Sequence, residues 1–156
     1  MIIPDINLLV YAYCQEAPYH ASAKLWWENL CSQREPIGFP WAVSCGFVRV
    51  MTHPSILTNP LHPSEAVVHV RSWLVRSHIQ TLDPGPRHLE ILTHLLETIG
   101  VAGNLTTDAH LAAIAIEYQG EVHSNDSDFQ RFPGLRFSNP LKMQTLEKRT
   151  IKRRKS

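Results

Sequence analysis

The chain opens with MIIPDINLLVYAY (residues 1–13), in which two apolar runs flank a proline and an aspartate. We predict a short buried strand over Met1–Ile3 that ends near Asp5. Asn7 is placed to cap a short helix over Leu8–Tyr13, because its side chain can bond to the first backbone N–H groups of a helix. A strand, an aspartate and a helix in succession form the first unit expected of an α/β fold.

The same alternation of short strands and helices continues along the chain. We expect helices over residues 20–30, 41–51, 64–77, 87–99 and 107–118, and strands over residues 79–82, 121–124 and 135–138. Residues 36–40 are either a brief strand or a turn. In the helix over 87–99, apolar residues recur at helical spacing (Leu89, Leu92, Leu96 and Ile99), and Gly100 follows where a C-terminal glycine cap belongs. The pattern predicts a parallel sheet with helices on both faces.

Length and charge divide the chain into a body and a tail. At 156 residues, with 44% hydrophobic and 19% charged residues, the chain has the size and composition of one globular domain. Residues 142–156 hold seven of the fifteen Lys/Arg and one of the fourteen Asp/Glu, which leaves eight basic and thirteen acidic residues in 1–141. We predict a domain over 1–141 and a basic tail over 142–156.

The basic tail has two interpretations. An acidic body with a basic tail indicates a polyanionic partner that the tail attracts. A solvated tail that only aids solubility explains the same composition. Under the first interpretation, the candidate nucleic-acid contacts are Lys148, Arg149, Lys152, Arg153 and Arg154.

The cysteines and the first residues indicate a cytoplasmic protein. Cys14, Cys31 and Cys45 are odd in number and lack CxxC spacing, which is typical of free thiols in a reducing compartment. The N-terminal apolar run has no basic segment before it, and Asp5 interrupts it, so it does not read as a signal peptide. No apolar stretch approaches the roughly 18 residues that span a bilayer, so we expect no membrane association.

Aspartates stand where two predicted strands and one helix meet the same edge of the sheet. Asp5 follows the first strand, and Asp126 follows the strand over 121–124. Asp108 lies in the first turn of the helix over 107–118, where the helix dipole favours an anion, and Asp128 is two residues beyond Asp126. Ligands of open parallel sheets bind at the carboxyl ends of the strands. We therefore expect these carboxylates to gather at one rim.

Clustered carboxylates suit a metal-dependent nuclease. They stay ionised together only with a cation between them, and hard oxygen ligands select Mg²⁺ or Mn²⁺. Such an ion can polarise a phosphoryl oxygen and activate a water. Each aspartate also has an ordinary structural interpretation. Asp5 and Asp108 suit the start of a helix, and Asp126 and Asp128 suit a turn.

Four stretches together resemble the VapC toxins of type II toxin–antitoxin systems, which are PIN-domain ribonucleases. They are PDINLL (4–9), FVRVMTHP (47–54), GNLTTDAHLAA (103–113) and SNDSDFQRFPGL (124–135). The resemblance runs in order from Asp5 to about Pro140, which is nearly the whole chain. The stretches around Asp108 and Asp126 are specific in combination, and any one alone is weak.

The resemblance implies a fold, an activity and partners. The fold would be a three-layer α/β/α PIN domain with a small central parallel sheet. The activity would be endoribonuclease cleavage of RNA with Mg²⁺ or Mn²⁺, by a toxin that is often a homodimer and that a VapB-like antitoxin inhibits. Carried over by position, the metal-binding and catalytic carboxylates would be Asp5, Asp108 and Asp126. The neighbouring roles would be Asp128 as a further acidic ligand, and Asn7 and Thr107 as polar supports.

One position departs from the family pattern. Many members have a glutamate directly before the Phe-Val-Arg run, where this chain has Gly46. The site would then hold one metal ion rather than two, which Mg²⁺ tolerates because it uses few carboxylates and keeps several waters. Glu90 is a conceivable substitute from another helix. Arg49, in the Phe-Val-Arg run, is either a partner for a site carboxylate or a surface cation.

Two other functions compete with a nuclease. A degenerate PIN domain that binds RNA or a protein without cleavage would explain Gly46, although such a module has no need of a repulsive acidic cluster. An aspartate-dependent phosphotransferase would need a second aspartate where Asn7 stands. The sequence has no P-loop, GxSxG or GxGxxG motif, which argues against an NTPase, an α/β-hydrolase or a dinucleotide enzyme.

Overall fold

The computed structural model describes residues 1–100 and 102–142, and these contain one five-stranded sheet in the order β3-β2-β1-β4-β5. The strands are β1 (Ile2–Pro4), β2 (Ile37–Pro40), β3 (Ile79–Leu82), β4 (Glu121–His123) and β5 (Arg136–Ser138). Each neighbouring pair is parallel. The predicted parallel sheet is therefore confirmed, and the stretch over 36–40 is a strand.

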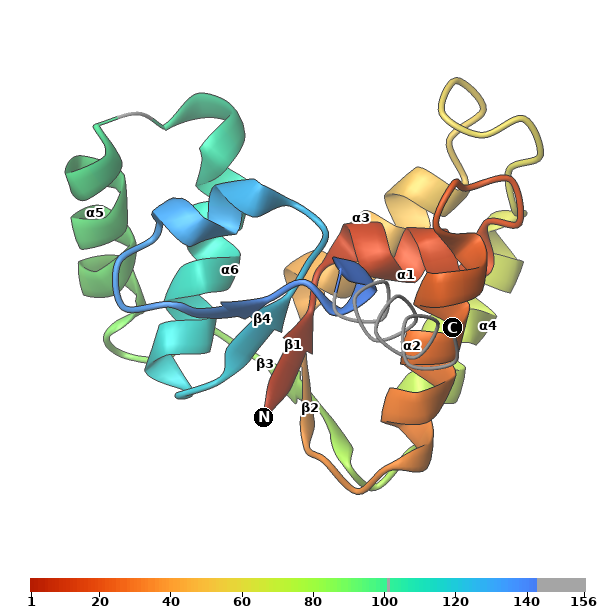
Figure 1. The fold of residues 1–156 in the computed structure, drawn as a ribbon, viewed down its shortest axis with the longest axis horizontal. Helices are drawn as coiled ribbons and strands as arrows, with labels where there is room; N and C mark the ends of the chain where they lie inside the picture. The colour runs from red at the N-terminus through yellow and green to blue at the C-terminus, as the bar shows by residue number, and fades with distance from the viewer. Residues whose placement is uncertain (101, 143–156) are drawn as a thin grey trace, which may run out of the picture.

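Helices cover both faces of the sheet and make three layers. The helices are α1 (Ile6–Tyr13), α2 (His20–Ser32), α3 (Trp41–Met51), α4 (Pro63–Leu74), α5 (His88–Ile99) and α6 (Thr106–Glu117), with short 3-10 turns η1 (Gly103–Leu105) and η2 (Ser127–Arg131). Figure 1 shows α5 and α6 on one side of the strands and α1 to α4 on the other. The predicted α/β/α architecture is confirmed.

The core forms where the central strands meet the helices. β2 is buried along its whole length, as expected for a parallel strand covered on both faces. On the side of α1 to α4, Trp73 of α4 packs against Phe39 of β2, with ring centroids 5.3 Å apart, and against Phe47 of α3, with centroids 4.8 Å apart. Trp27 of α2 joins this aromatic group. The two tryptophans thus join α2, α3 and α4 to the central strand β2, next to β1.

The observed helices differ from the predicted ones in two informative places. α1 begins at Ile6, and its N-cap is Asp5 rather than Asn7, because the Asp5 carboxylate accepts a hydrogen bond from the Ile6 N–H. Leu89 is 73% exposed, while Ile91 and Leu95 carry the contact of α5 with the core. The leucine spacing predicted the helix correctly, but the buried face of the helix is centred on Ile91 and Leu95 and does not include Leu89.

Three further predictions concern the end of α5, membrane spans and the basic tail. Gly100 adopts φ 73° as the C-cap of α5, as predicted for a glycine at that position. None of the helices within residues 1–100 and 102–142 combines the length and apolar character needed to cross a membrane. The predicted tail contacts between Lys148 and Arg154 lie outside the described residues, so the boundary between domain and tail stays a prediction.

Candidate active site

The pairing of β1 with β4 brings two distant parts of the chain to one rim. Pro4 is in register with His123, and the Asp5 N–H donates to the His123 carbonyl over 2.9 Å. The chain builds β2 and β3 on one side of β1 and β4 and β5 on the other, so the order of the sheet reverses between β1 and β4. The carboxyl ends of strands at such a reversal are where open α/β sheets bind ligands.

Asp5 is held by a buried hydrogen-bond network at this rim. Its Oδ1 accepts from the Ile6 N–H over 2.7 Å, and its Oδ2 accepts from the Ser124 hydroxyl and the Asn7 side-chain amide, each over 2.6 Å. Asn7 also donates to the Ser124 hydroxyl over 2.9 Å. These bonds fix the orientation of a carboxylate that is only 8% exposed. Asn7 is therefore a polar neighbour of Asp5, as the resemblance implied.

The segment after β4 carries the next two carboxylates. The Asp126 N–H donates to the Ser124 hydroxyl over 2.9 Å, so one serine joins the backbone of Asp126 to the side chain of Asp5. Asp126 then caps η2, because its Oδ1 accepts from the Asp128 N–H over 2.9 Å. A turn role and a place in the acidic cluster are thus combined in the same residue.

Asp108 completes the cluster from the first turn of α6. Partial burial, followed by the negative charges of Asp5, Asp126 and Asp128, raises its pKa to about 6. Burial is also the main cause that raises the pKa of Asp5, while the hydrogen bonds from Ser124 and Ile6 oppose this and the charge of Asp126 adds to it. The four predicted carboxylates therefore interact electrostatically at one rim, as expected from the sequence.

The donor chemistry fits a hard divalent cation. Carboxylate oxygens are the ligands that Mg²⁺ and Mn²⁺ prefer, and a cation would remove the repulsion that raises the pKa of Asp108. Within residues 1–100 and 102–142, however, no three His, Cys, Asp or Glu side chains are arranged as a ready-made metal site. The residues therefore fit Mg²⁺ held by one or two direct carboxylates and several waters better than a closed protein cage.

The other predicted site residues form no hydrogen bond or ion pair with this network. Thr107 is exposed at the start of α6. Arg49 forms no ion pair with a described carboxylate and lines an apolar groove between α3 and α4. Glu90, the conceivable substitute for the missing glutamate, is exposed and paired with Arg87 over 3.0 Å. None of the three is brought to the Asp5 network.

Two features of the site were not recognised from the sequence. Ser124 is fully buried and bonds to three site residues, and its position directly after β4, two residues beyond the buried Val122, could have indicated this. Gly46 packs directly against Ile6, where an added Cβ would stand 2.9 Å from Cγ1 of Ile6 and closer still to its Cδ1. The isoleucine beside Asp5 thus occupies the space next to the missing glutamate.

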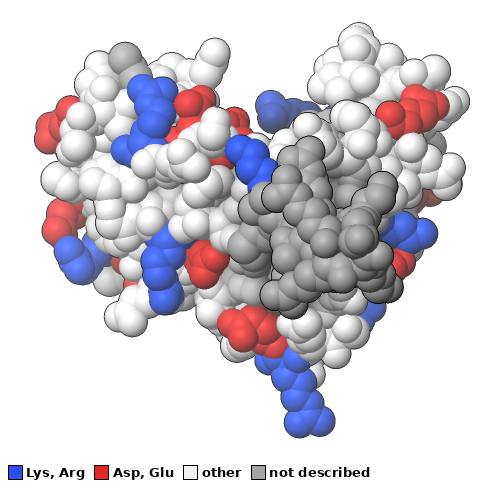
Figure 2. Space-filling view, viewed as in Figure 1, with Lys and Arg blue, Asp and Glu red and all other residues white. Residues whose placement is uncertain are grey.

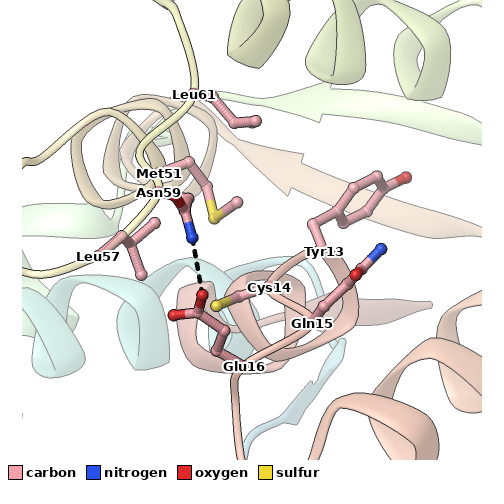
Figure 3. A pocket seen from close by; sticks show the side chains of 8 residues that line it. All are labelled: Tyr13, Cys14, Gln15, Glu16, Met51, Leu57, Asn59 and Leu61. Carbon is pink, nitrogen blue, oxygen red and sulfur yellow. Dashed lines mark hydrogen bonds between the residues drawn. The ribbon is translucent and has the colours of Figure 1, made fainter.

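A cavity of about 240 Å³ lies away from the carboxylates, at the end of α1. Figure 3 shows its lining residues, which are Tyr13, Cys14, Gln15, Glu16, Met51, Leu57, Asn59 and Leu61. The Asn59 amide donates to Glu16 over 2.8 Å across it. None of the predicted site residues lines this cavity, so it is separate from the candidate active site.

Comparisons with known proteins agree with the fold and show the family. The family model described as "PIN domain" matches residues 2–135. The chain is 44% identical over 142 residues to "Ribonuclease VapC33" of Mycobacterium tuberculosis, covering 91% of this chain and 99% of that protein. It is 36% identical to "Ribonuclease VapC37" of the same species, covering 90% of this chain and 97% of that protein.

Solved structures with similar folds come from toxin–antitoxin systems. The VapBC2 complex of Rickettsia felis, bound to a DNA fragment from its promoter, matches with a TM-score of 0.64 and 21% identity over 89% of this chain and 98% of that chain. VapC20 of Mycobacterium tuberculosis, described as a sarcin-ricin loop cleaving toxin, matches with a TM-score of 0.64 and 14% identity over 87% and 99%. At these identities the structures support the fold.

The fold and the rim of carboxylates define a PIN-type nuclease domain. By the family match and by its identity to curated relatives over nearly their full length, this chain belongs to the PIN-domain family and, within it, to the VapC ribonucleases.

Proposed function

We propose that this ribonuclease hydrolyses phosphodiester bonds of RNA at a Mg²⁺ or Mn²⁺ ion held by the carboxylates of Asp5, Asp108 and Asp126, one or two of them directly and the rest through water. The observation that carries the proposal is the meeting of these carboxylates at one rim, where the Ser124 hydroxyl joins the Asp5 carboxylate to the backbone of Asp126 and Asp108 in the first turn of α6 interacts with both. Clustered carboxylates lower the stability of the fold when no cation is bound, and a role in binding or catalysis explains such a cluster. A bound cation of this kind supplies Lewis acidity toward a phosphoryl oxygen and acidifies a coordinated water.

The residues of this chain have distinct tasks in that site. Ser124 and Asn7 keep the Asp5 carboxylate oriented and favour its ionised form by donating hydrogen bonds to it. Asp126 is positioned through its backbone bond to Ser124, and Asp108 by the first turn of α6. Asp128 adds negative charge at the edge of the cluster. The protein therefore prepares the ligands before RNA or metal arrives.

The contact between Gly46 and Ile6 favours one metal ion rather than two. No described carboxylate of α3 faces the site, because the helix has glycine where many relatives have glutamate, and Ile6 fills the adjacent space. One cation with several water ligands is compatible with the carboxylates that remain. The site would then consist of the carboxylates that follow β1, begin α6 and follow β4, with a single metal ion.

The proposal extends to partners and cellular role. VapBC complexes among the similar structures support a VapB-like antitoxin as the partner that inhibits this toxin. We also propose, from the family resemblance, that the toxin forms a homodimer and acts in the cytoplasm. The basic tail contains Lys148, Arg149, Lys152, Arg153 and Arg154, and we propose that it adds salt-dependent affinity for RNA.

The test is cleavage of total bacterial RNA by the full chain purified without antitoxin. Wild type is incubated with Mn²⁺, Mg²⁺ or EDTA, beside Asp108→Asn and Asp126→Asn, and the products are resolved on a denaturing gel. We expect cleavage that needs the metal and falls at least roughly a hundredfold in both variants, as for loss of a group that positions catalytic charge. Asp83→Asn changes an exposed aspartate outside the cluster and serves as the matched control.

The outcomes separate the nuclease from a binding module. Folded wild type that binds RNA without cleaving it, with any of these metals, would support the non-cleaving alternative. Metal-independent cleavage, or cleavage that survives in Asp108→Asn and Asp126→Asn, would reject the proposed site. Thermal melting of each variant shows whether a loss of activity reflects unfolding.

A further inference from the structure

An ion pair stands at the edge of the carboxylate cluster. Arg131 is the last residue of η2, and its Nη1 lies 3.6 Å from Oδ1 of Asp128. Both side chains are about half exposed, at 45% and 49%. Asp128 in turn acts electrostatically on Asp108, so the guanidinium lies near the carboxylates. A positive charge is thus held beside a strongly negative rim.

The backbone that carries Arg131 is fixed on both sides. Asp126 caps η2 by accepting a hydrogen bond from the Asp128 N–H. Phe129 is 1% exposed and anchors the same turn in the core, with its ring 6.0 Å from those of Phe132 and Phe137. A cation on so short and well-anchored a turn keeps a defined distance from Asp126, which is what binding a substrate group requires.

The other ion pairs of the described residues lie elsewhere. They join Met1 to Glu35, Lys24 to Glu28, Arg87 to Glu90 and His123 to Glu121. Among residues 1–100 and 102–142, Arg131 is therefore the only arginine or lysine that forms an ion pair with a carboxylate of the cluster. Basic and acidic side chains lie next to one another over α6 and the segment after β4 in Figure 2.

The geometry of the pair leaves the guanidinium able to bind an anion. At 3.6 Å the contact with Asp128 is longer than a hydrogen bond, so it orients Arg131 without occupying its five N–H donors. Guanidinium groups bind phosphate through paired hydrogen bonds, and these are stronger than neutral ones. A polyanion that approaches four carboxylates needs such a fixed positive charge to offset the repulsion.

We propose that Arg131 binds a phosphate of the RNA next to the scissile one, and that Asp128 positions its guanidinium for this contact. The inference rests on the proposed RNA cleavage at the adjacent carboxylates and names a substrate contact for it. Asp128 is then a positioning residue whose oxygen faces arginine, while Asp5, Asp108 and Asp126 face the cation.

The experiment compares Arg131→Ala, Arg131→Lys and Asp128→Asn with Arg87→Ala in the full chain. Arg87 is the matched control, because it is also exposed and paired with an acid three residues away, on α5. Binding of a fluorescein-labelled oligouridylate is measured in EDTA over a series of KCl concentrations, so that no cleavage occurs. Cleavage of total RNA in Mn²⁺ and the shift of the melting temperature by Mn²⁺ are measured on the same proteins.

We expect Arg131→Ala to weaken oligouridylate binding by roughly five- to tenfold and to lower the slope of log affinity against log salt by about 0.7, the value for one phosphate contact on a single strand. Arg131→Lys should keep the slope but not the full affinity, because lysine supplies charge without the planar donors. Asp128→Asn should weaken binding less than Arg131→Ala. Stabilisation by Mn²⁺ should be unchanged in Arg131→Ala.

The result that overturns the inference is equality of Arg131→Ala and Arg87→Ala in affinity and salt slope. Loss of Mn²⁺ stabilisation in Arg131→Ala would also overturn it, because the residue would then support the metal site. These outcomes differ from failure of the proposed function. If wild type does not cleave RNA, the nuclease proposal fails, while the binding series in EDTA still decides whether Arg131 contacts phosphate.

Discussion

Ser124 donates a hydrogen bond from its hydroxyl to Oδ2 of Asp5 over 2.6 Å, and the same hydroxyl accepts from the N–H of Asp126. A fully buried side chain directly after β4 thus links the carboxylate after β1 to the segment that begins at Asp126. Because the two strands are adjacent, this bond depends on the order of the sheet. The arrangement of Asp5 and Asp126 therefore depends on the pairing of β1 with β4.

The first prediction concerns that hydroxyl. Ser124→Ala removes a donor to Asp5 and the acceptor for the N–H groups of Asn7 and Asp126. We expect a loss of about 1–3 kcal/mol in the free energy of unfolding and a fall of roughly tenfold or more in the cleavage rate as Asp5 loses its orientation. Ser127→Ala, at an exposed serine of η2, is the control. Urea unfolding and RNA cleavage that match the control would show that Ser124 is dispensable.

The second prediction concerns the contact between Gly46 and Ile6. In most helix interiors Gly→Ala stabilises by roughly 0.5–1 kcal/mol. At Gly46 the new methyl group would press on Ile6, so we expect Gly46→Ala to destabilise by about 1–3 kcal/mol. Ile6→Ala in the same protein should recover part of that loss, with a coupling free energy of about 1 kcal/mol in a double-mutant cycle. Strictly additive effects would mean that the two residues do not compete for space.

The third prediction is that the acidic cluster costs stability when no metal is present. Asp108 has its pKa raised to about 6, so near pH 7 the folded state holds a carboxylate that burial and three neighbours disfavour. Between about pH 6 and 4 the folded form binds more protons than the unfolded form, and stability relative to an uncharged variant rises as the pH falls. Allowing for partial exposure, the effect is on the order of 1 kcal/mol, or about 2–4 °C.

The measurement is the melting temperature of wild type and Asp108→Asn in EDTA from pH 7.5 to 4. We expect the variant to melt higher at neutral pH and the difference to close toward pH 4. Added Mn²⁺ should raise the melting temperature of wild type more than that of the variant. If Asp108→Asn is the less stable protein at pH 7, the cluster is not under electrostatic strain.

The sequence predicted where these carboxylates lie, because each of them follows a strand or begins a helix. Asp5 caps α1 and Asp126 caps η2, so the ordinary structural interpretation of each aspartate is correct, and so is the prediction that they share a rim. Strand ends and helix starts are local features, and the parallel sheet fixes which of them meet. The predicted α/β fold and its helices follow from the same local periodicity.

The remaining features depend on packing that periodicity does not encode. The contact of Gly46 with Ile6 joins α3 to α1, and no spacing rule specifies which residues of two packed helices touch. The exposure of Leu89 has the same origin, because the position of α6 decides which side of α5 is covered. His88 is a third case, because the packing of α5 on α6 buries its Nδ1 without a hydrogen-bond partner among the described residues, and the spacing of α5 does not indicate this.

The last prediction concerns the contact between His88 of α5 and His110 of α6. The Nε2 of His88 and the Nδ1 of His110 are 2.9 Å apart, a distance that requires one ring to donate and the other to accept. Burial and the neighbouring His88 lower the pKa of His110, so the folded protein keeps this ring neutral at pH values where the unfolded chain protonates it. Because the unfolded chain then binds a proton that the folded ring does not, the stability of the fold falls as the pH drops below the ordinary histidine pKa of about 6.5.

We therefore expect wild type to lose more stability than His110→Gln between pH 7 and 5. Urea unfolding in EDTA at the two pH values measures this difference, and the opposite contribution of Asp108 is common to both proteins. His94→Gln is the control, because His94 is exposed on α5 and should leave the pH dependence of wild type unchanged. Parallel pH profiles for wild type and His110→Gln would mean that the histidine contact does not couple folding to protonation.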